Sequence, residues 1–160
     1  MSLIDEINSH KSLTLIDYGE PKLNCFRVVI GEDRVLGEIE DIKIGEVTLS
    51  GSRPVGFDDL CRIYEITFDS YVIYSIRNES CCTRDYSEVF TGHLFRVYSK
   101  SHFLEYVRTS TFTPEWFPWA CGTPAHYEVI CNDHIIDVFC VKEPEITISR
   151  ESRKRFVKDN

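Results

Sequence analysis

The 160-residue chain lacks any apolar run long enough to cross a membrane as a helix. Its strongly apolar segments, such as Val28 to Ile30 and His134 to Val141, are far shorter than the roughly 18 residues that such a helix needs. The first residues, Met1 to Lys11, also lack the basic start and continuous apolar stretch of an export signal. We therefore expect a cytoplasmic protein with no membrane partner.

The seven cysteines include no CxxC pair. In a chain without an export signal they indicate reduced thiols packed as small hydrophobes. Cys121, His126, Cys131 and His134 are competent zinc ligands, but structural zinc sites usually contain closely spaced pairs. If residues 127–131 form a strand, His126 and Cys131 point to opposite faces. We favour packing over zinc here and expect no metal and no cofactor.

No nucleophile elbow, phosphate loop, dinucleotide fingerprint or HExxH helix occurs in the chain. Cys81 and Cys82 are the candidate nucleophiles, with His93 or His126 as a possible base. Their surroundings contain Glu79, Asp85 and Glu88, and acidic neighbours raise the pKa of a thiol. We expect no catalytic residues, and a protein that works by binding rather than as an enzyme.

Positive charge is scarce: 18 lysines and arginines stand against 26 aspartates and glutamates, giving a formal charge of −8. Residues 150–160 carry a local +3, so the remainder carries −11. A body this acidic repels phosphate backbones and attracts cationic surfaces. The composition therefore favours a basic protein partner and disfavours nucleic acid.

Apolar residues make up 42% of the chain and aromatic residues 12%, enough for a packed core in one domain spanning residues 1–160. The clearest pattern is a period of two, which predicts a half-buried strand pair or one long strand with a bend at Asp69-Ser70. Its apolar members are Tyr64, Ile66, Phe68, Val72, Tyr74 and Ile76. We predict an α+β fold, mainly antiparallel β-sheet with one or two short packed helices.

Turn residues predict hairpins around Gly45-Glu46 and around Asn132 to His134, with a further strand from Asn24 to Ile30. A short helix is expected from Leu3 to Ser9, capped by Ser2, and a second after Ser99 or Ser101. The tail from Ser149 to Asn160 is either a frayed helix or a disordered end.

Acidic residues concentrate between Glu32 and Glu46. They fit either an edge hairpin whose charges prevent sheet-to-sheet pairing or a surface that attracts a basic protein. On the second interpretation the partner-binding candidates are Glu38, Glu40 and Asp41, together with the acidic pair Asp58 and Asp59.

The segment Thr113 to Trp119 holds both tryptophans and two of the six prolines. If exposed, Trp116 and Trp119 form a rigid aromatic platform of the kind found at binding hot spots. If buried, they close one end of the sheet, and we favour this reading because large aromatic side chains usually end up largely buried. Both residues remain binding candidates.

Three stretches, 71–80, 92–101 and 134–138, resemble a group of small bacterial proteins, some of which look like immunity proteins of contact-dependent or polymorphic toxin systems. The resemblance implies a cytosolic antidote that caps a toxin domain, often a nuclease, by charge and shape complementarity. The alternative is a non-catalytic module in which the sheet and the tryptophan segment bind a small molecule.

Overall fold

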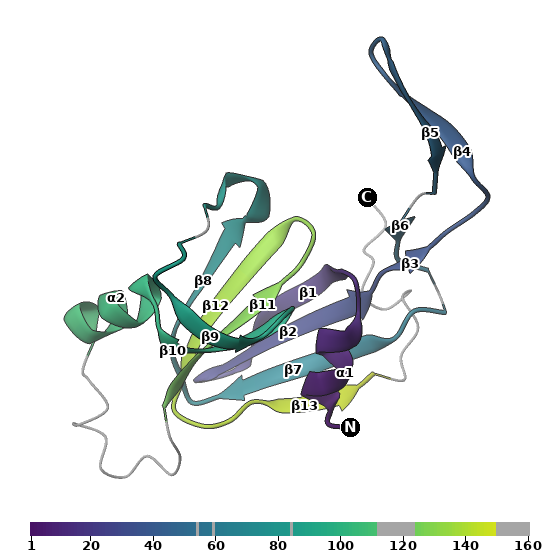
Figure 1. The fold of residues 1–160 in the computed structure, drawn as a ribbon. Helices are drawn as coiled ribbons and strands as arrows, with labels where there is room; N and C mark the ends of the chain where they lie inside the picture. The colour runs from purple at the N-terminus through teal and green to yellow at the C-terminus, as the bar shows by residue number, and fades with distance from the viewer. Residues whose placement is uncertain (54, 59, 84, 112–123, 150–160) are drawn as a thin grey trace.

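A computed structural model of the chain describes residues 1–53, 55–58, 60–83, 85–111 and 124–149. These residues form mainly antiparallel β-sheet with two short α-helices, which confirms the predicted fold class (Figure 1). Two larger sheets share one core, and a hairpin stands clear of both. No helix among the described residues is long and apolar enough to span a bilayer.

The first sheet has four antiparallel strands in the order β1-β2-β7-β13. β1 and β2 form a hairpin that turns at Asn24, which takes a φ of 57°. The buried positions of β2 and β7 are largely β-branched or aromatic, the residue types that a pleated surface accommodates best. The bounds are β1 (Leu13–Lys22), β2 (Cys25–Glu32), β7 (Ile63–Asp69) and β13 (Glu145–Ile148).

The second sheet has five antiparallel strands in the order β8-β12-β11-β10-β9. β11 and β12 form the hairpin that the sequence predicts between residues 127 and 141. β8 and β9 are the two edges of this sheet, so each pairs with a single neighbour in it. The bounds are β8 (Tyr71–Asn78), β12 (His134–Cys140), β11 (Ala125–Ile130), β10 (Phe95–Lys100) and β9 (Val89–Gly92).

The chain passes from the first sheet to the second at Ser70, which takes a φ of 66°. The Ser70 N–H donates to the carbonyl oxygen of Asn24 at 2.8 Å, which ties this turn to the β1-β2 turn. The bend predicted at Asp69-Ser70 is therefore confirmed, and the alternating apolar residues are divided between two sheets. Tyr64, Ile66 and Phe68 enter the core from β7, and Tyr74 and Ile76 pack against it from β8.

Helix α1 (Leu3–Ser9) begins with a capping box: the Asp5 N–H donates to the Ser2 hydroxyl, and the Ser2 N–H donates to the Asp5 carboxylate. It buries Ile7 in the core. Helix α2 (His102–Ser110) is capped by Ser101 and buries Val107. Both helices lie where the sequence predicts them.

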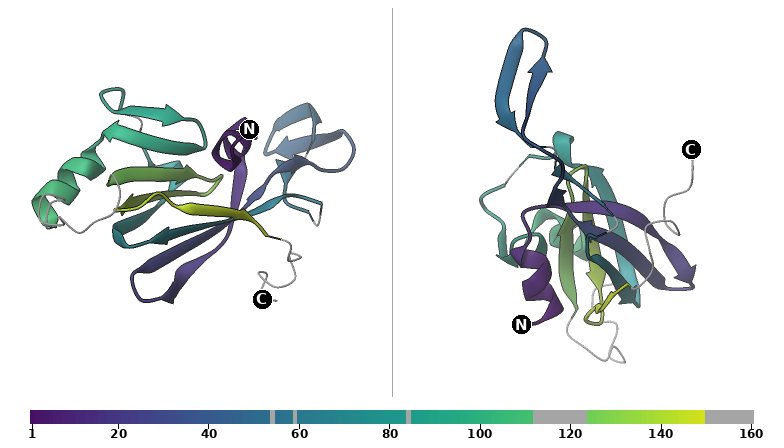
Figure 2. Two further views of the ribbon diagram at one scale, coloured as in Figure 1. Left: turned by 90° about the horizontal axis from the view of Figure 1, so that it is seen from below. Right: turned by 90° about the vertical axis from the view of Figure 1, so that its right-hand side faces the viewer.

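A narrow ribbon leads out of the body, formed by β3 (Arg34–Val35) and β6 (Val55–Gly56). It carries a hairpin made of β4 (Glu40–Ile44) and β5 (Val47–Ser52), which projects away from both sheets (Figure 2). Gly45 takes a φ of 61° at the hairpin tip, as predicted for this turn. A short 3₁₀ turn, η1 (Glu79–Cys81), follows β8.

Five strands were not predicted: the two-residue strands β3 and β6, and the longer strands β1, β9 and β13. β1 is ten residues long, but its second half contains Gly19 and Pro21, which favour turns. The pairing with β2 tolerates them through a register shift between Gly19 and Lys22. β13 and β9 are each four residues long, too short for a period of two to stand out.

The Asn8 side chain links α1 to the second sheet. Its Oδ1 atom accepts hydrogen bonds from three consecutive backbone N–H groups, those of His93, Leu94 and Phe95, each at 2.8 Å. Gly92 precedes them with a φ of 93°, and a Cβ there would lie 2.0 Å from the Phe95 carbonyl oxygen. Only glycine fits this tight approach.

Replacing Asn8 by alanine removes the acceptor of all three N–H groups. We expect Asn8→Ala to lower the free energy of unfolding by about 1–3 kcal/mol in urea denaturation, because partly buried donors lose their partner. Asn8→Asp keeps an acceptor oxygen at the same place and should recover most of this loss. Equal losses in the two variants would contradict the proposed role of Oδ1.

Candidate functional site

The outer face of the five-stranded sheet carries charged and aromatic side chains in two cross-strand rows. One row runs Ser75, Asp137, Glu128 and Arg96 across β8, β12, β11 and β10. The neighbouring row runs Phe139, His126, Tyr98 and Phe90 across β12, β11, β10 and β9. Since the opposite face of this sheet forms the core, these rows lie on the side where a two-layer fold normally meets solvent.

Two carboxylates, Asp137 and Glu128, face each other directly in the first row, and both are almost fully buried. The Arg77 guanidinium balances both negative charges, because its Nη2 atom lies 2.9 Å from Asp137 Oδ2 and 3.3 Å from Glu128 Oε2. Arg96 Nη1 lies 3.2 Å from Glu128 Oε1, and the Tyr98 hydroxyl donates to the same oxygen at 2.8 Å. The pair of like charges is therefore held between two guanidinium groups.

Burial raises the pKa of Glu128 above the usual glutamate value, and the neighbouring Asp137 charge acts in the same direction. The hydrogen bond from Tyr98 and the positive charge of Arg96 oppose this shift. Burial also raises the pKa of the Tyr98 phenol, so Tyr98 remains a donor at neutral pH. Glu128 therefore takes up a proton more readily than an ordinary glutamate.

His126 connects this network to α2. Its Nε2 atom lies 3.0 Å from Asp137 Oδ1 and its Nδ1 atom 2.9 Å from the Ser101 hydroxyl. The ring is stacked on Tyr98 at a centroid distance of 4.4 Å, with Phe103 of α2 4.7 Å away on a tilted plane. Both ring nitrogens and the ring itself are therefore engaged.

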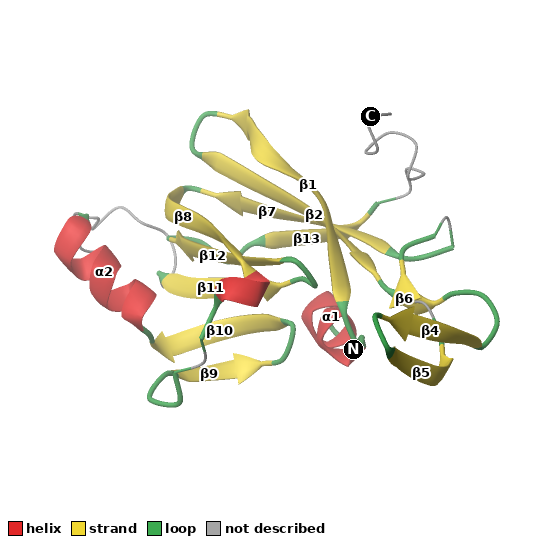
Figure 3. Cartoon of the chain, turned by 90° about the horizontal axis from the view of Figure 1, so that it is seen from above, coloured by secondary structure: helices red, strands yellow, loops and turns green. Residues whose placement is uncertain are grey.

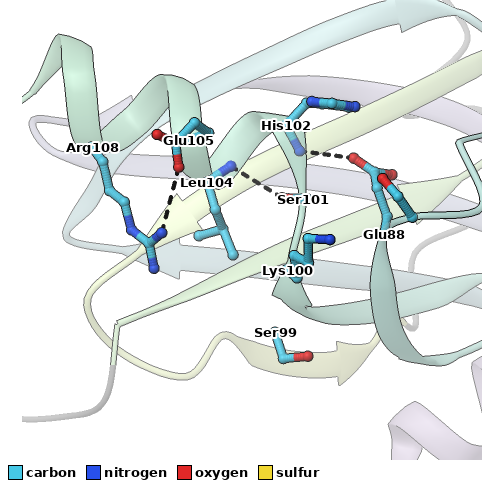
Figure 4. Close-up of a pocket in the computed structure, with 9 residues that line it drawn as sticks. Glu88, Ser99, Lys100, Ser101, His102, Leu104, Glu105 and Arg108 are labelled. Atoms are coloured by element: carbon cyan, nitrogen blue, oxygen red, sulfur yellow. Dashed lines mark hydrogen bonds and ion pairs between the residues drawn. The ribbon is translucent and has the colours of Figure 1, made fainter.

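Ser101, His126 and Asp137 form a chain of hydrogen bonds like that of a nucleophilic triad. Here, however, the Ser101 hydroxyl also accepts the Leu104 N–H at 3.0 Å as the cap of α2 (Figure 4). The adjacent His102 N–H, a potential oxyanion donor, donates instead to the Glu88 carboxylate at 2.9 Å. The arrangement is that of a helix cap fastened to a sheet.

The segment between η1 and β9 and the helix α2 cover these rows only in part and leave a groove. We call it the outer groove: its floor contains Arg77, Arg96, Tyr98 and Glu128, and its rim contains Glu79, Tyr86, Glu88 and Phe90. Its volume is about 430 Å³. A second hollow of about 400 Å³, lined by Phe103 and Tyr106 of α2, shares Arg77 and Glu128 with it. Most of the polar groups of the sheet face are reached from this groove.

The rim is fastened by an ion pair between Asp85 and His102, whose Oδ2 and Nε2 atoms lie 2.5 Å apart. Hydrogen bonds from Ser87 and His102 hold the pKa of Asp85 down at about 2. The same pair raises the pKa of His102. Arg96 also lies over the Phe90 ring, with its guanidinium carbon 4.1 Å from the centroid.

The acidic binding candidates lie far from this groove along the chain. Glu38 and Asp41 are exposed, and Glu40 begins β4, so the three belong to the projecting hairpin and its approach. Asp41 also has a structural role, because its Oδ1 accepts the Gly51 N–H at 3.2 Å beside a register shift. Asp58 shapes a loop by accepting the Leu60 N–H and the Cys61 thiol.

Other candidates lie outside the described residues: Asp59, Trp116, Trp119, Cys121 and the tail beyond Ser149. Within the described ranges, no group of three His, Cys, Asp or Glu side chains is arranged to hold a metal ion. Cys131 lies in the core, whereas His126 lies on the outer face. Cys81 is exposed and Cys82 half-buried at the groove, and all six described cysteines are free thiols.

The buried polar network was missed at the level of sequence, although a signal existed. Glu128 and Asp137 each interrupt a strand that is otherwise apolar, Tyr127 to Ile130 and Ile135 to Phe139. Parity assigns both carboxylates to the outer face, but it does not say that a helix and a loop cover that face. A charged residue in the middle of two adjacent apolar strands would have indicated the site.

The raised pKa of Glu128 has a consequence for stability. Between the unfolded value near 4.5 and the higher folded value, the native state binds more protons than the unfolded state, so stability falls as pH rises. Glu128→Gln resembles the protonated form, so the variant lacks this pH-dependent contribution to the free energy of unfolding. The stability of the natural chain minus that of Glu128→Gln should therefore decrease above pH 4.5, by about 1.4 kcal/mol per unit of pKa shift.

Urea unfolding followed between pH 4 and 8 measures this difference. Glu105→Gln, on the exposed side of α2, is the matched control for the loss of one glutamate charge. Parallel curves for Glu128→Gln and the natural chain would show that Glu128 has the same proton affinity in both states.

A scan against protein-family models found no match for this chain, and searches of curated proteins and of solved structures found none either.

Proposed function

We propose that this chain is an immunity-type protein that neutralises a cationic toxin domain, with a nuclease as one candidate, by binding it tightly and without catalysis. The observation that carries the proposal is the projecting hairpin β4-β5, which presents acidic and apolar side chains together. Residues 71–80, 92–101 and 134–138 resemble a group of small bacterial proteins, some of which look like immunity proteins, and this resemblance agrees with the proposal.

The hairpin is built for contact rather than for the stability of the body. An isolated two-stranded hairpin is marginally stable in water, and this one projects away from both sheets (Figure 1). Its approach and tip expose Ile39, Ile44 and Val47, each with at least 60% of its surface accessible. Ile44 and Val47 face each other across the turn. A partner surface would cover apolar area that the body leaves exposed.

Exposed carboxylates lie among these apolar side chains: Glu38 and Asp41 near the base and Glu46 at the tip. A nuclease needs a cationic groove for its substrate, and an acidic projection matches that groove in charge and shape. The strongly negative charge of the whole chain extends this attraction beyond the contact itself. The proposal thus combines steering by charge with anchoring by apolar contact.

A small-molecule module is the second candidate, favoured by the outer groove and its volume of about 430 Å³. Pockets for drug-sized ligands are lined mainly by apolar side chains with a few polar groups. The floor of the outer groove instead consists of charged groups that satisfy one another. A metabolite that raises the midpoint of thermal unfolding in a dose-dependent way would favour this candidate.

The first test is capture of the partner from source cells on the tagged chain, with elution by increasing salt and identification of the eluted protein. The proposal requires a basic protein that inhibits growth when produced alone and is tolerated when this chain is produced with it. A partner without toxicity, or growth inhibition that this chain does not relieve, would overturn the assignment.

The role of the hairpin is tested by kinetics with the purified partner. We expect Glu38→Lys/Glu46→Lys to reduce the association rate constant at least about tenfold at low salt, with a smaller change in dissociation, because outlying charges act mainly on encounter. These positions leave the hydrogen bond from Gly51 to Asp41 intact.

The matched control is Glu143→Lys/Glu145→Lys, which changes the net charge by the same amount. Both residues are exposed, Glu145 at the start of β13 and Glu143 just before it. It should slow association much less. Equal slowing in both double variants would mean that only net charge matters, and unchanged association in the hairpin variant would exclude this surface from the contact.

A further inference from the structure

The strand β9 leaves an open sheet edge beside the outer groove. β9 is the last strand of the five-stranded sheet, and no described residue pairs with its outer edge. All four of its residues are exposed, including Val89 and Phe90. Figure 3 shows this edge at the rim of the sheet, with α2 and α1 near its two ends. An edge of this kind accepts an additional strand through its free backbone groups.

The outer groove begins at that edge. Phe90 of β9 belongs to its rim, in the same cross-strand row as Tyr98 of β10. A sixth strand would lie about 4.8 Å beyond β9, so its outward side chains would continue this row. Long side chains at those positions would extend past Phe90, whose ring is covered by the Arg96 guanidinium, toward the rim of the groove. Side chains of the opposite parity would point toward the core side of the sheet and would lie beside the exposed Val89.

The excess of carboxylates in the lining of the outer groove favours a cationic occupant. Four carboxylates line it, those of Glu79, Asp85, Glu88 and Glu128, against the two arginines of its floor. Both guanidinium groups are turned toward Glu128, and that of Arg77 also toward Asp137. The exposed Glu79 has no ion pair among the described residues, and Tyr86, which lines the same groove, is 93% exposed. The rim therefore offers negative charge and an aromatic ring to a cation.

We propose that an extended basic segment of the partner protein adds to β9 as a sixth strand and places an arginine or lysine side chain in the outer groove, against Glu79 and Tyr86. The inference rests on the proposed function for the existence of a basic partner. Main-chain hydrogen bonds to the β9 edge supply affinity, and the groove supplies the preference for a cation at alternate positions. A second copy of this chain is disfavoured as occupant because two bodies of −8 repel each other.

The probe is a labelled, end-blocked heptapeptide in which arginine and valine alternate, titrated with the full chain at low salt. Saturable binding is expected from fluorescence anisotropy, together with slower amide exchange at Val89 to Gly92. The same peptide with alternate backbone amides N-methylated should bind at least about tenfold more weakly, since strand addition needs those groups. The glutamate-valine counterpart should not bind.

Two variants locate the site. Glu79→Lys and Tyr86→Ala alter only exposed rim side chains, and each should weaken peptide binding at least about fivefold while the urea unfolding midpoint stays unchanged. Glu38→Lys/Glu46→Lys on the hairpin should leave peptide binding intact. Because the peptide is not the partner, its binding is decided independently of whether a toxin is found.

Three results would overturn the inference. One is the absence of saturable binding up to about 1 mM peptide. Another is binding that N-methylation does not weaken and that the small cation agmatine matches, which would make the groove a site for a free amine. The third is binding abolished by the hairpin variant and unaffected by Glu79→Lys, which would assign the basic segment to the hairpin.

Discussion

Asp137 and Glu128 face each other across β12 and β11 with almost no exposed surface. Much of the surrounding structure balances the negative charges of this pair. Two buried carboxylates on adjacent strands repel each other and lose hydration, so they persist only where positive charge and hydrogen-bond donors replace water. Arg77 and Arg96 supply the charge from either side, and His126 and Tyr98 supply further polar contacts. Removal of any one partner would leave a buried charge with less compensation than it has now.

The same requirement explains why α2 lies where it does. The Ser101 hydroxyl serves two structures at once, because it accepts the N–H of Leu104, the third residue of the helix, and contacts His126 on the sheet. The helix cap and the polar network are therefore coupled, and Phe103 closes over the imidazole ring from the helix side. On the opposite end of the sheet, Asn8 does the equivalent work by joining α1 to three consecutive amides. Each helix thus has a polar side chain that fastens it to the five-stranded sheet, and Glu6 of α1 also accepts a hydrogen bond from the Tyr64 hydroxyl of the first sheet at 2.8 Å.

Local rules of sequence predicted the parts of the fold that local interactions determine. Ser2 and Asp5 identify α1, Gly45 identifies the hairpin tip, and the alternation of residues 64–76 identifies strands on either side of Ser70. The same rules do not predict that those strands enter different sheets, since this depends on the turn conformation at one residue. They also place Glu128 and Asp137 on an outer face without indicating the cover, because the cover comes from segments distant in the chain.

The groups that hold the outer face together differ from the groups that remain available to a partner. Glu128, Asp137 and the two arginines satisfy one another, so a ligand gains little by approaching them and would have to break existing ion pairs. Among the described residues, the Glu79 carboxylate forms no ion pair, Tyr86 is exposed, and the outer edge of β9 is unpaired. The exposed apolar side chains of the hairpin, Ile44 and Val47, also lie outside this network. β9 and the hairpin lie on either side of α1 (Figure 3). A partner that engages both would gain from the second contact as an intramolecular event, so a short edge strand and a marginal hairpin could together support tight binding although each alone is weak.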